Sequence, residues 1–279
     1  MFAIVLALGS SLAYGLSDFL GGVKSRSAAA TLTVLLVSQS TALVLLIAIV
    51  TALGEGMPKG LYLFAALAGL CETVGIAALY RGLASGTMST VAPIAAAAPV
   101  VPVAIGAILG EYPTPVQGIG IALAVTGIVL SSRSRPSPDA AAAGGGSSIV
   151  LGLVAALGFG GFYVSMDAAS DASVPWALLT ARSTAVAALL AAFLVVRPAA
   201  VRSTDLPPLA LIGALIVSAD GMFALASTMD FLGVVAVLSS LHPVVTIALA
   251  RVFLHERQER VQQIGIACCL VGVVAISAG

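Results

Sequence analysis

The chain has 279 residues, of which 60% are hydrophobic and 9% are charged, and its 12 basic and 12 acidic residues give a formal net charge of +0. Soluble domains carry about 25% charged residues, so this composition excludes an ordinary soluble protein. The lack of a net positive charge or a basic patch excludes nucleic acid as a partner. The high hydrophobic content also excludes a disordered chain, which leaves a multi-span integral membrane protein.

The first apolar run, at about residues 2–22, precedes the first basic residue, Lys24. A signal peptide begins with a basic region and has a shorter apolar stretch, so this run is predicted to be a membrane span. Nine more runs have about 20 apolar residues, enough for a helix to cross a hydrocarbon core of about 30 Å. They are at about 29–53, 60–83, 87–109, 115–132, 148–168, 173–196, 208–229, 233–254 and 261–277. The sequence predicts an all-α integral membrane protein with ten transmembrane helices.

The longest polar interruption lies near the middle of the chain, at residues 133–147. It is rich in Pro, Gly, Ser and Ala, a composition that is typical of a flexible linker. We therefore expect two halves of five spans each, at residues 1–132 and 148–279.

A repeat relates the two halves. Glu111 and Glu256 are 145 positions apart, and Gln39 and Arg182 occupy corresponding places at a separation of 143. Because five is an odd number of spans, the second half must enter the membrane from the opposite side. The sequence therefore predicts inverted repeats, which are typical of secondary transporters with a substrate site near the midplane. Three further pairs keep the separation of 145: Gln117 and Gln262, Gly120 and Gly265, and Gly127 and Gly272.

In each half a glutamate is followed by a short polar turn, by Gln-x-x-Gly and by a glycine-spaced helix. This pattern resembles the drug/metabolite transporter superfamily, and within it the ten-helix EamA-like transporter family, over essentially the whole chain. The resemblance implies that amino acids, nucleobases, drugs or other small metabolites are moved across the cytoplasmic membrane, often outward. The residues that carry it are Glu111, Gln117, Gly120 and Gly127 in the first half, and Pro243, Glu256, Gln262, Gly265 and Gly272 in the second.

These motif residues are predicted to be structural. Glu111 and Glu256 follow spans four and nine, where a negative side chain can cap the positive N-terminus of the next helix. The glycines favour close helix packing. That packing could occur within the monomer or across a homodimer, and Gly106 and Gly110 form a further small-xxx-small motif.

Five polar residues are predicted to lie inside spans, where ionisable side chains are costly and are therefore candidates for function. Arg182 has a planar guanidinium that suits a carboxylate, either from a substrate or from Glu72 or Asp220. The alternative is a polar cluster that only holds helices together. Glu72 and Asp220 are candidate proton-coupling sites, with helix contacts or a lining role at an entrance as the alternatives. The five residues are Gln39, Glu72, Arg182, Asp220 and His242.

His242 precedes Pro243, which can kink the ninth span. We expect a hydrogen-bonded structural histidine in preference to a proton carrier. Tyr14 and Tyr163 could line a cavity, although packing or interfacial anchoring is the favoured role for aromatic side chains in spans.

The leading hypothesis is a secondary transporter that moves a small metabolite or drug, such as an amino-acid-like solute, outward by alternating access. A proton is the candidate coupling ion, and neither a cofactor nor a metal is expected. The sequence has no Walker-type loop, so direct use of ATP is not supported. It also has no recognisable selectivity-filter sequence, so a channel is less favoured than a carrier. The alternative is an intramembrane enzyme that acts on a lipid-linked substrate, although HExxH and GxSxG motifs are absent. A membrane scaffold or receptor is disfavoured, because it would not need ionisable residues in the bilayer.

The basic residues also predict an orientation. Ten of the 12 lie in loops after odd-numbered spans or at the edge of span nine, whereas Lys59 alone follows an even-numbered span. By the positive-inside rule the odd-numbered loops are cytoplasmic and both termini are outside. The family resemblance implies the opposite orientation, with both termini inside.

Overall fold

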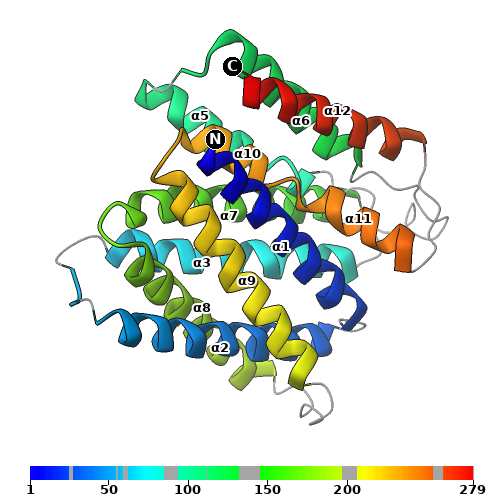
Figure 1. Cartoon of the computed structure of the whole chain (residues 1–279). Coiled ribbons are helices and arrows are strands. Elements are labelled where there is room, and N and C mark those ends of the chain that lie inside the picture. The colour runs from blue at the N-terminus through cyan, green and yellow to red at the C-terminus, as the bar shows by residue number, and fades with distance from the viewer. Residues whose placement is uncertain are drawn as a thin grey trace.

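The structure is a computed structural model, and it describes residues 1–24, 28–54, 56–58, 62–84, 94–110, 112–131, 145–196, 206–253 and 260–278. All regular secondary structure in these ranges is helical (Figure 1). The first half contains α1 (Phe2–Lys24), α2 (Ala28–Leu53), α3 (Tyr62–Ala84), α5 (Val100–Leu109) and α6 (Pro115–Ser131). The second half contains α7 (Gly145–Ser170), α8 (Val174–Val196), α9 (Leu206–Ser227), α10 (Leu232–Ser239), α11 (His242–Phe253) and α12 (Arg260–Ala278).

Ten apolar segments of these helices correspond to the ten predicted spans. Among the described residues, six helices are long and apolar enough to cross a membrane: α1, α2, α3, α7, α8 and α9. Four shorter apolar segments are α5, α6, the α10–α11 region and α12. Large apolar side chains such as Val195, which is 83% exposed, cover the outside, where lipid rather than water is their natural solvent. The protein is an all-α integral membrane protein with ten transmembrane segments.

Two spans are interrupted, a detail that the apolar runs at 87–109 and 233–254 did not predict. A turn at residues 240–241 separates α10 from α11. In the first half, a turn at residues 96–99 precedes α5, and residues 85–93 lie outside the described part of the chain. Pro99 and Pro243 stand at the starts of α5 and α11, where a residue without an N–H is tolerated because the first turn has no intrahelical acceptor for it.

The contacts between helices come in pairs that are related by exchange of the two halves. The helices α2 and α8, and likewise α6 and α12, are equivalent in the two halves and contact each other. In the first half, α3 contacts α7 and α8. Its equivalent in the second half, α9, contacts the equivalents of those two helices, α1 and α2. Figure 1 shows α1 beside α9 and α6 beside α12. This arrangement is that of two inverted repeats around a pseudo-two-fold axis in the membrane plane.

The motif glycines lie where α6 and α12 touch. A Cβ atom on Gly127 would be 2.6 Å from the backbone oxygen of Gly265, and one on Gly272 would be 2.7 Å from the backbone oxygen of Gly120. Both separations are shorter than real Cβ atoms show, so only glycine allows the backbones to approach this closely. These contacts lie within one chain. Glu111 and Glu256 lie outside the described residues.

The other small-residue motif also has a place within the chain. Gly106 is buried on α5, and Gly110 ends that helix with a φ of 91°, a left-handed conformation that favours glycine. The Gly110 N–H bonds the last carbonyls of the helix. The predicted linker is described only from Gly145, where α7 begins.

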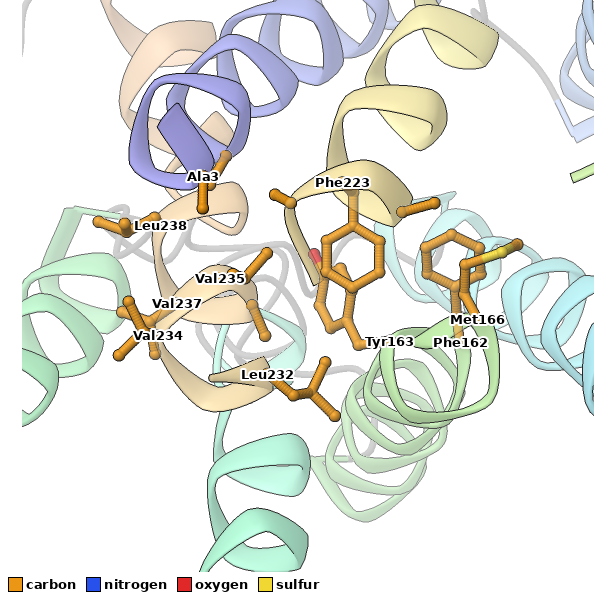
Figure 2. Packing of buried hydrophobic residues seen from close by; sticks show 14 of the residues in the cluster. Ala3, Phe162, Tyr163, Met166, Phe223, Leu232, Val234, Val235, Val237 and Leu238 are labelled. Atoms are coloured by element: carbon orange, nitrogen blue, oxygen red, sulfur yellow. The ribbon is translucent and has the colours of Figure 1, made fainter. Parts of the chain in front are cut away.

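The apolar core lies between the repeats (Figure 2). Nearly every residue of α10 is buried, including Val235 and Leu238, so this helix is surrounded by protein on all sides. Next to it the aromatic rings of Tyr163 and Phe223 pack with their centroids 4.8 Å apart. The core therefore fixes α7, α9 and α10 around the polar residues described next.

Candidate functional site

Five polar side chains from five helices meet near the middle of the bundle. Each lies near the middle of its own helix, and four of them are 0–6% exposed. We call the five residues the central cluster. They are Tyr14 from α1, Gln39 from α2, Glu72 from α3, Arg182 from α8 and Asp220 from α9.

Arg182 is the centre of this cluster. Its Nη1 donates to Oε1 of Gln39 and, at 3.3 Å, to Oε1 of Glu72. Its Nη2 donates to Oδ2 of Asp220, and the hydroxyl of Tyr14 donates to Oδ1 of the same carboxylate. Removing charges from water is costly, and the guanidinium offsets this cost by binding two carboxylates.

The repeat explains why Gln39 and Arg182 meet. They occupy corresponding positions on α2 and α8, which contact each other across the pseudo-two-fold axis. Residues at equivalent places near such an axis face each other. The sequence predicted this juxtaposition, and the structure brings Glu72, Asp220 and Tyr14 to the same point.

Two buried atoms of the cluster have no hydrogen-bond partner among the described residues. They are Nε of Arg182, a donor, and Oε2 of Glu72, an acceptor. An unpaired buried polar atom costs about 1–3 kcal/mol, and more when the group is charged. Arg182 thus keeps one unused donor and Glu72 one unused acceptor inside the bundle.

Tyr163 lies at a separate place in the core. Its hydroxyl accepts a hydrogen bond from Oγ of Ser240 at 2.9 Å, and its ring packs against those of Phe162 and Phe223 (Figure 2). Ser240 is in the turn between α10 and α11. Tyr163 thus links α7 to the turn of the interrupted span.

His242 is the first residue of α11 and binds a residue of α1. Its Nδ1 is 2.8 Å from Oδ2 of Asp18, and its ring centroid is 5.9 Å from that of Tyr14. The expected hydrogen bond of His242 is present. Through Tyr14, the histidine is also connected with the central cluster.

One signal in the sequence would have shown that Tyr14 and Tyr163 are equivalent. The segment Ala-Leu-Gly at residues 7–9, followed by Tyr14 and Asp18, recurs at residues 156–158 with Tyr163 and Asp167. By contrast, nothing in the sequence indicates that Asp18 binds His242, because the two residues are 224 positions apart and belong to different repeats.

Two hollows in the described part of the protein lie away from the cluster. The first lies between the start of α3, the end of α7 and the start of α8, and it includes Tyr62, Ser173 and Trp176. The second lies between α5, α6 and α10. Neither contains a residue of the central cluster, which is buried. In the described part of the chain, no three His, Cys, Asp or Glu residues are placed to hold a metal ion.

Comparison with known proteins identifies the family. A crystal structure described only as that of a protein matches with a TM-score of 0.80, covering 99% of this chain and 96% of that chain at 13% identity. At that identity the likeness shows the fold alone. No curated protein sequence matches significantly. The sequence model of the EamA-like transporter family matches residues 1–133 and, a second time, residues 146–278. The chain therefore belongs to the EamA-like transporter family of the drug/metabolite transporter superfamily, and is a multi-pass membrane transporter of small molecules.

Proposed function

We propose that this protein is a secondary carrier that exports an amino-acid-like solute across the cytoplasmic membrane by alternating access around the central cluster. One observation carries the proposal. The buried cluster leaves one donor, Nε of Arg182, and one acceptor, Oε2 of Glu72, without partners among the described residues. A zwitterion that carries a carboxylate and an ammonium group complements both atoms.

In this proposal the solute's carboxylate binds Nε of Arg182, the guanidinium nitrogen that no residue of the cluster occupies. The solute's ammonium group binds Glu72, whose only contact in the cluster is at 3.3 Å. A zwitterion adds no net charge to the site. Binding therefore supplies partners for both atoms without adding an uncompensated charge to a region of low dielectric.

Burial of the cluster supports alternating access. Arg182 and Asp220 are 2% and 0% exposed, so a solute reaches them only when helices move apart. Inverted repeats that meet along equivalent helices can rock against each other and open the site to one face at a time. A continuous pore would leave such a cluster wet.

A proton is the proposed coupling ion, and Glu72 is the residue that binds it. The cluster contains two carboxylates and one guanidinium. Asp220 accepts from both Arg182 and Tyr14, whereas Glu72 has one oxygen without a partner among the described residues. A proton on Glu72 therefore neutralises the site when no solute is bound.

The test is flux of labelled amino acids and related solutes into sealed vesicles that contain the purified protein. We expect Arg182→Ala to abolish flux and to remove the thermal stabilisation that a bound solute gives to the wild type. Arg182→Lys is the matched control. It keeps the charge but lacks the two-point fork, so we expect weaker binding than in the wild type, by about tenfold or more.

Retained flux in a folded Arg182→Ala protein would remove Arg182 from the site. Recovery of a chemically altered solute would favour the alternative of an intramembrane enzyme. Membrane insertion of each variant is checked by its yield and elution behaviour in detergent.

A further inference from the structure

The contact between α1 and α11 joins the two repeats on one side of the central cluster. Asp18 binds His242 at 2.8 Å, and Oγ1 of Thr246 donates to the backbone oxygen of Gly15 at 3.2 Å. A Cβ atom on Gly15 would lie 2.5 Å from Cβ of Val245, so the two helices approach as closely as a glycine allows. The Asp18–His242 pair is thus part of a tight seam between the repeats.

This pair lies between the cluster and the surface. The side chains of His242 and Asp18 are 31% and 43% exposed, whereas Asp220 is fully buried. Tyr14 precedes Asp18 by one helical turn and lies on the same face of α1. Its ring contacts His242 and its hydroxyl donates to Asp220. Contacts therefore run without interruption from the half-exposed pair to the buried carboxylate.

A break between two helices lies directly beside the pair. His242 directly follows the turn at residues 240–241, and the N–H of Leu241 bonds the carbonyl of Leu238 at a long 3.4 Å. Movement at such a turn lets α11 swing while α10, which is buried on all sides, stays in place. Motion of one part of an interrupted span relative to the other is a simple way to uncover a site at the midplane.

The pair exists in one half only. Asp167 corresponds to Asp18 in the second repeat, and Ala98 corresponds to His242 in the first, because Pro99 and Pro243 are equivalent. An alanine side chain cannot bind a carboxylate. The equivalent seam on the opposite side of the cluster therefore lacks this pair.

We propose that the Asp18–His242 pair is a gate that closes the central cluster toward the face at which α1 and α11 end. Breaking the pair releases α11 from α1 and from the ring of Tyr14, and so exposes Asp220 and Arg182 to that face. The pair is ionic only when His242 is protonated. In the described part of the chain, the ionisable groups beside the histidine are Asp18 and Tyr14 on α1, since α6 and α10 have no ionisable side chain, and Tyr163 of α7 interacts electrostatically with Asp18. The inference rests on the carrier function proposed above.

The test measures access and needs no solute. Cys71, Cys268 and Cys269 are replaced by alanine, and Leu241→Cys, at a position 7% exposed beside the gate, serves as the probe. An impermeant thiol reagent is applied to either face in vesicles of known sidedness. We expect Asp18→Asn and His242→Gln each to speed labelling from the α1 and α11 end by about twofold to fivefold, as loss of a partly exposed ion pair predicts. Asp167→Asn, the matched control, should leave labelling unchanged.

The exchanged pair, Asp18→His with His242→Asp, should return labelling toward the wild-type rate. Unchanged labelling in both single variants would overturn the gate, as would faster labelling from the opposite face or an equal effect of Asp167→Asn. Failure of the gate and failure of the carrier are separable. Unchanged labelling in the Asp18 and His242 variants, with normal solute flux in the wild type, refutes the gate alone. Faster labelling in these variants, with no flux of any solute in the wild type, supports the gate and refutes the proposed carrier.

Discussion

The two buried carboxylates of the central cluster differ in the number of hydrogen bonds that they accept. Asp220 has a donor on each oxygen, from Arg182 and from Tyr14. Glu72 has one contact at 3.3 Å and one oxygen without a partner among the described residues. The first carboxylate therefore holds Arg182 in place, and the second is available for exchange of ligands.

This difference predicts opposite results for two conservative substitutions. Glu72→Gln should fold normally and lose uptake that is driven by a pH gradient, yet keep counterflow exchange, because the proton site is lost while the binding geometry remains. Asp220→Asn should lower the free energy of unfolding by about 3–5 kcal/mol, because it leaves Arg182 without its main counter-charge. Thermal unfolding and vesicle flux measure the two effects. Equal loss of stability in both variants would contradict the division of roles.

Much of the cluster was predictable because polar residues are rare in apolar spans. Gln39, Glu72, Arg182 and Asp220 stand out for that reason, and the repeat predicts that the first and third of them meet. The partners of Tyr14 and His242 were not predictable. They depend on the angle and register at which α1 crosses α9 and α11, and the sequence periodicity contains no information on that geometry.

At the scale of elements, the best prediction was the glycine-spaced pair of helices at the ends of the repeats. The separation of 145 positions identified the residues, and α6 and α12 touch at those glycines. The interruption of span four was missed, and span nine was expected at most to kink at Pro243. An apolar run continues through both turns, and a proline in the first turn of a helix looks the same as one that only kinks it.

Substitution on α6 tests this contact with a control on the same helix. Gly127→Ala should lower the free energy of unfolding by about 1–3 kcal/mol, because its Cβ would be 2.6 Å from the α12 backbone. A Cβ atom on Gly118 would meet no atom of another described helix within 4 Å, so Gly118→Ala should be stabilising by about 0.5–1 kcal/mol through helix propensity. Thermal unfolding in detergent compares the two. An unchanged free energy of unfolding in Gly127→Ala would mean that α6 and α12 lie further apart.

For the whole molecule, the pattern of spans and the inverted repeat followed from the sequence, and the orientation in the membrane is still a prediction. The even number of spans places both termini on one side of the membrane, and in Figure 1 the two ends of the chain lie on the same side of the view. The distribution of Lys and Arg predicts that this side is external. The proposed gate would then face the cytoplasm, the side from which an exporter loads its solute.

Two single cysteines test the orientation in the cysteine-free background. Met57→Cys, at a position 59% exposed between α2 and α3, should react with an impermeant reagent outside the cell. Ala140→Cys, in the predicted linker, should react only from the cytoplasmic side. The reverse pattern would support the orientation that the family resemblance implies, and would turn the gate toward the outside.

The pairing of helices across the repeats has a consequence for how the protein is made. Most of the described contacts of α1, α2, α3 and α6 are with helices of the second half, and neighbours such as α1 and α2 hardly touch. When the ribosome has completed the first five spans, these helices have few partners to bind. Assembly of these helices must therefore wait for the second half, which supplies most of their partners. The two halves, expressed as separate chains, should therefore accumulate only when they are produced together.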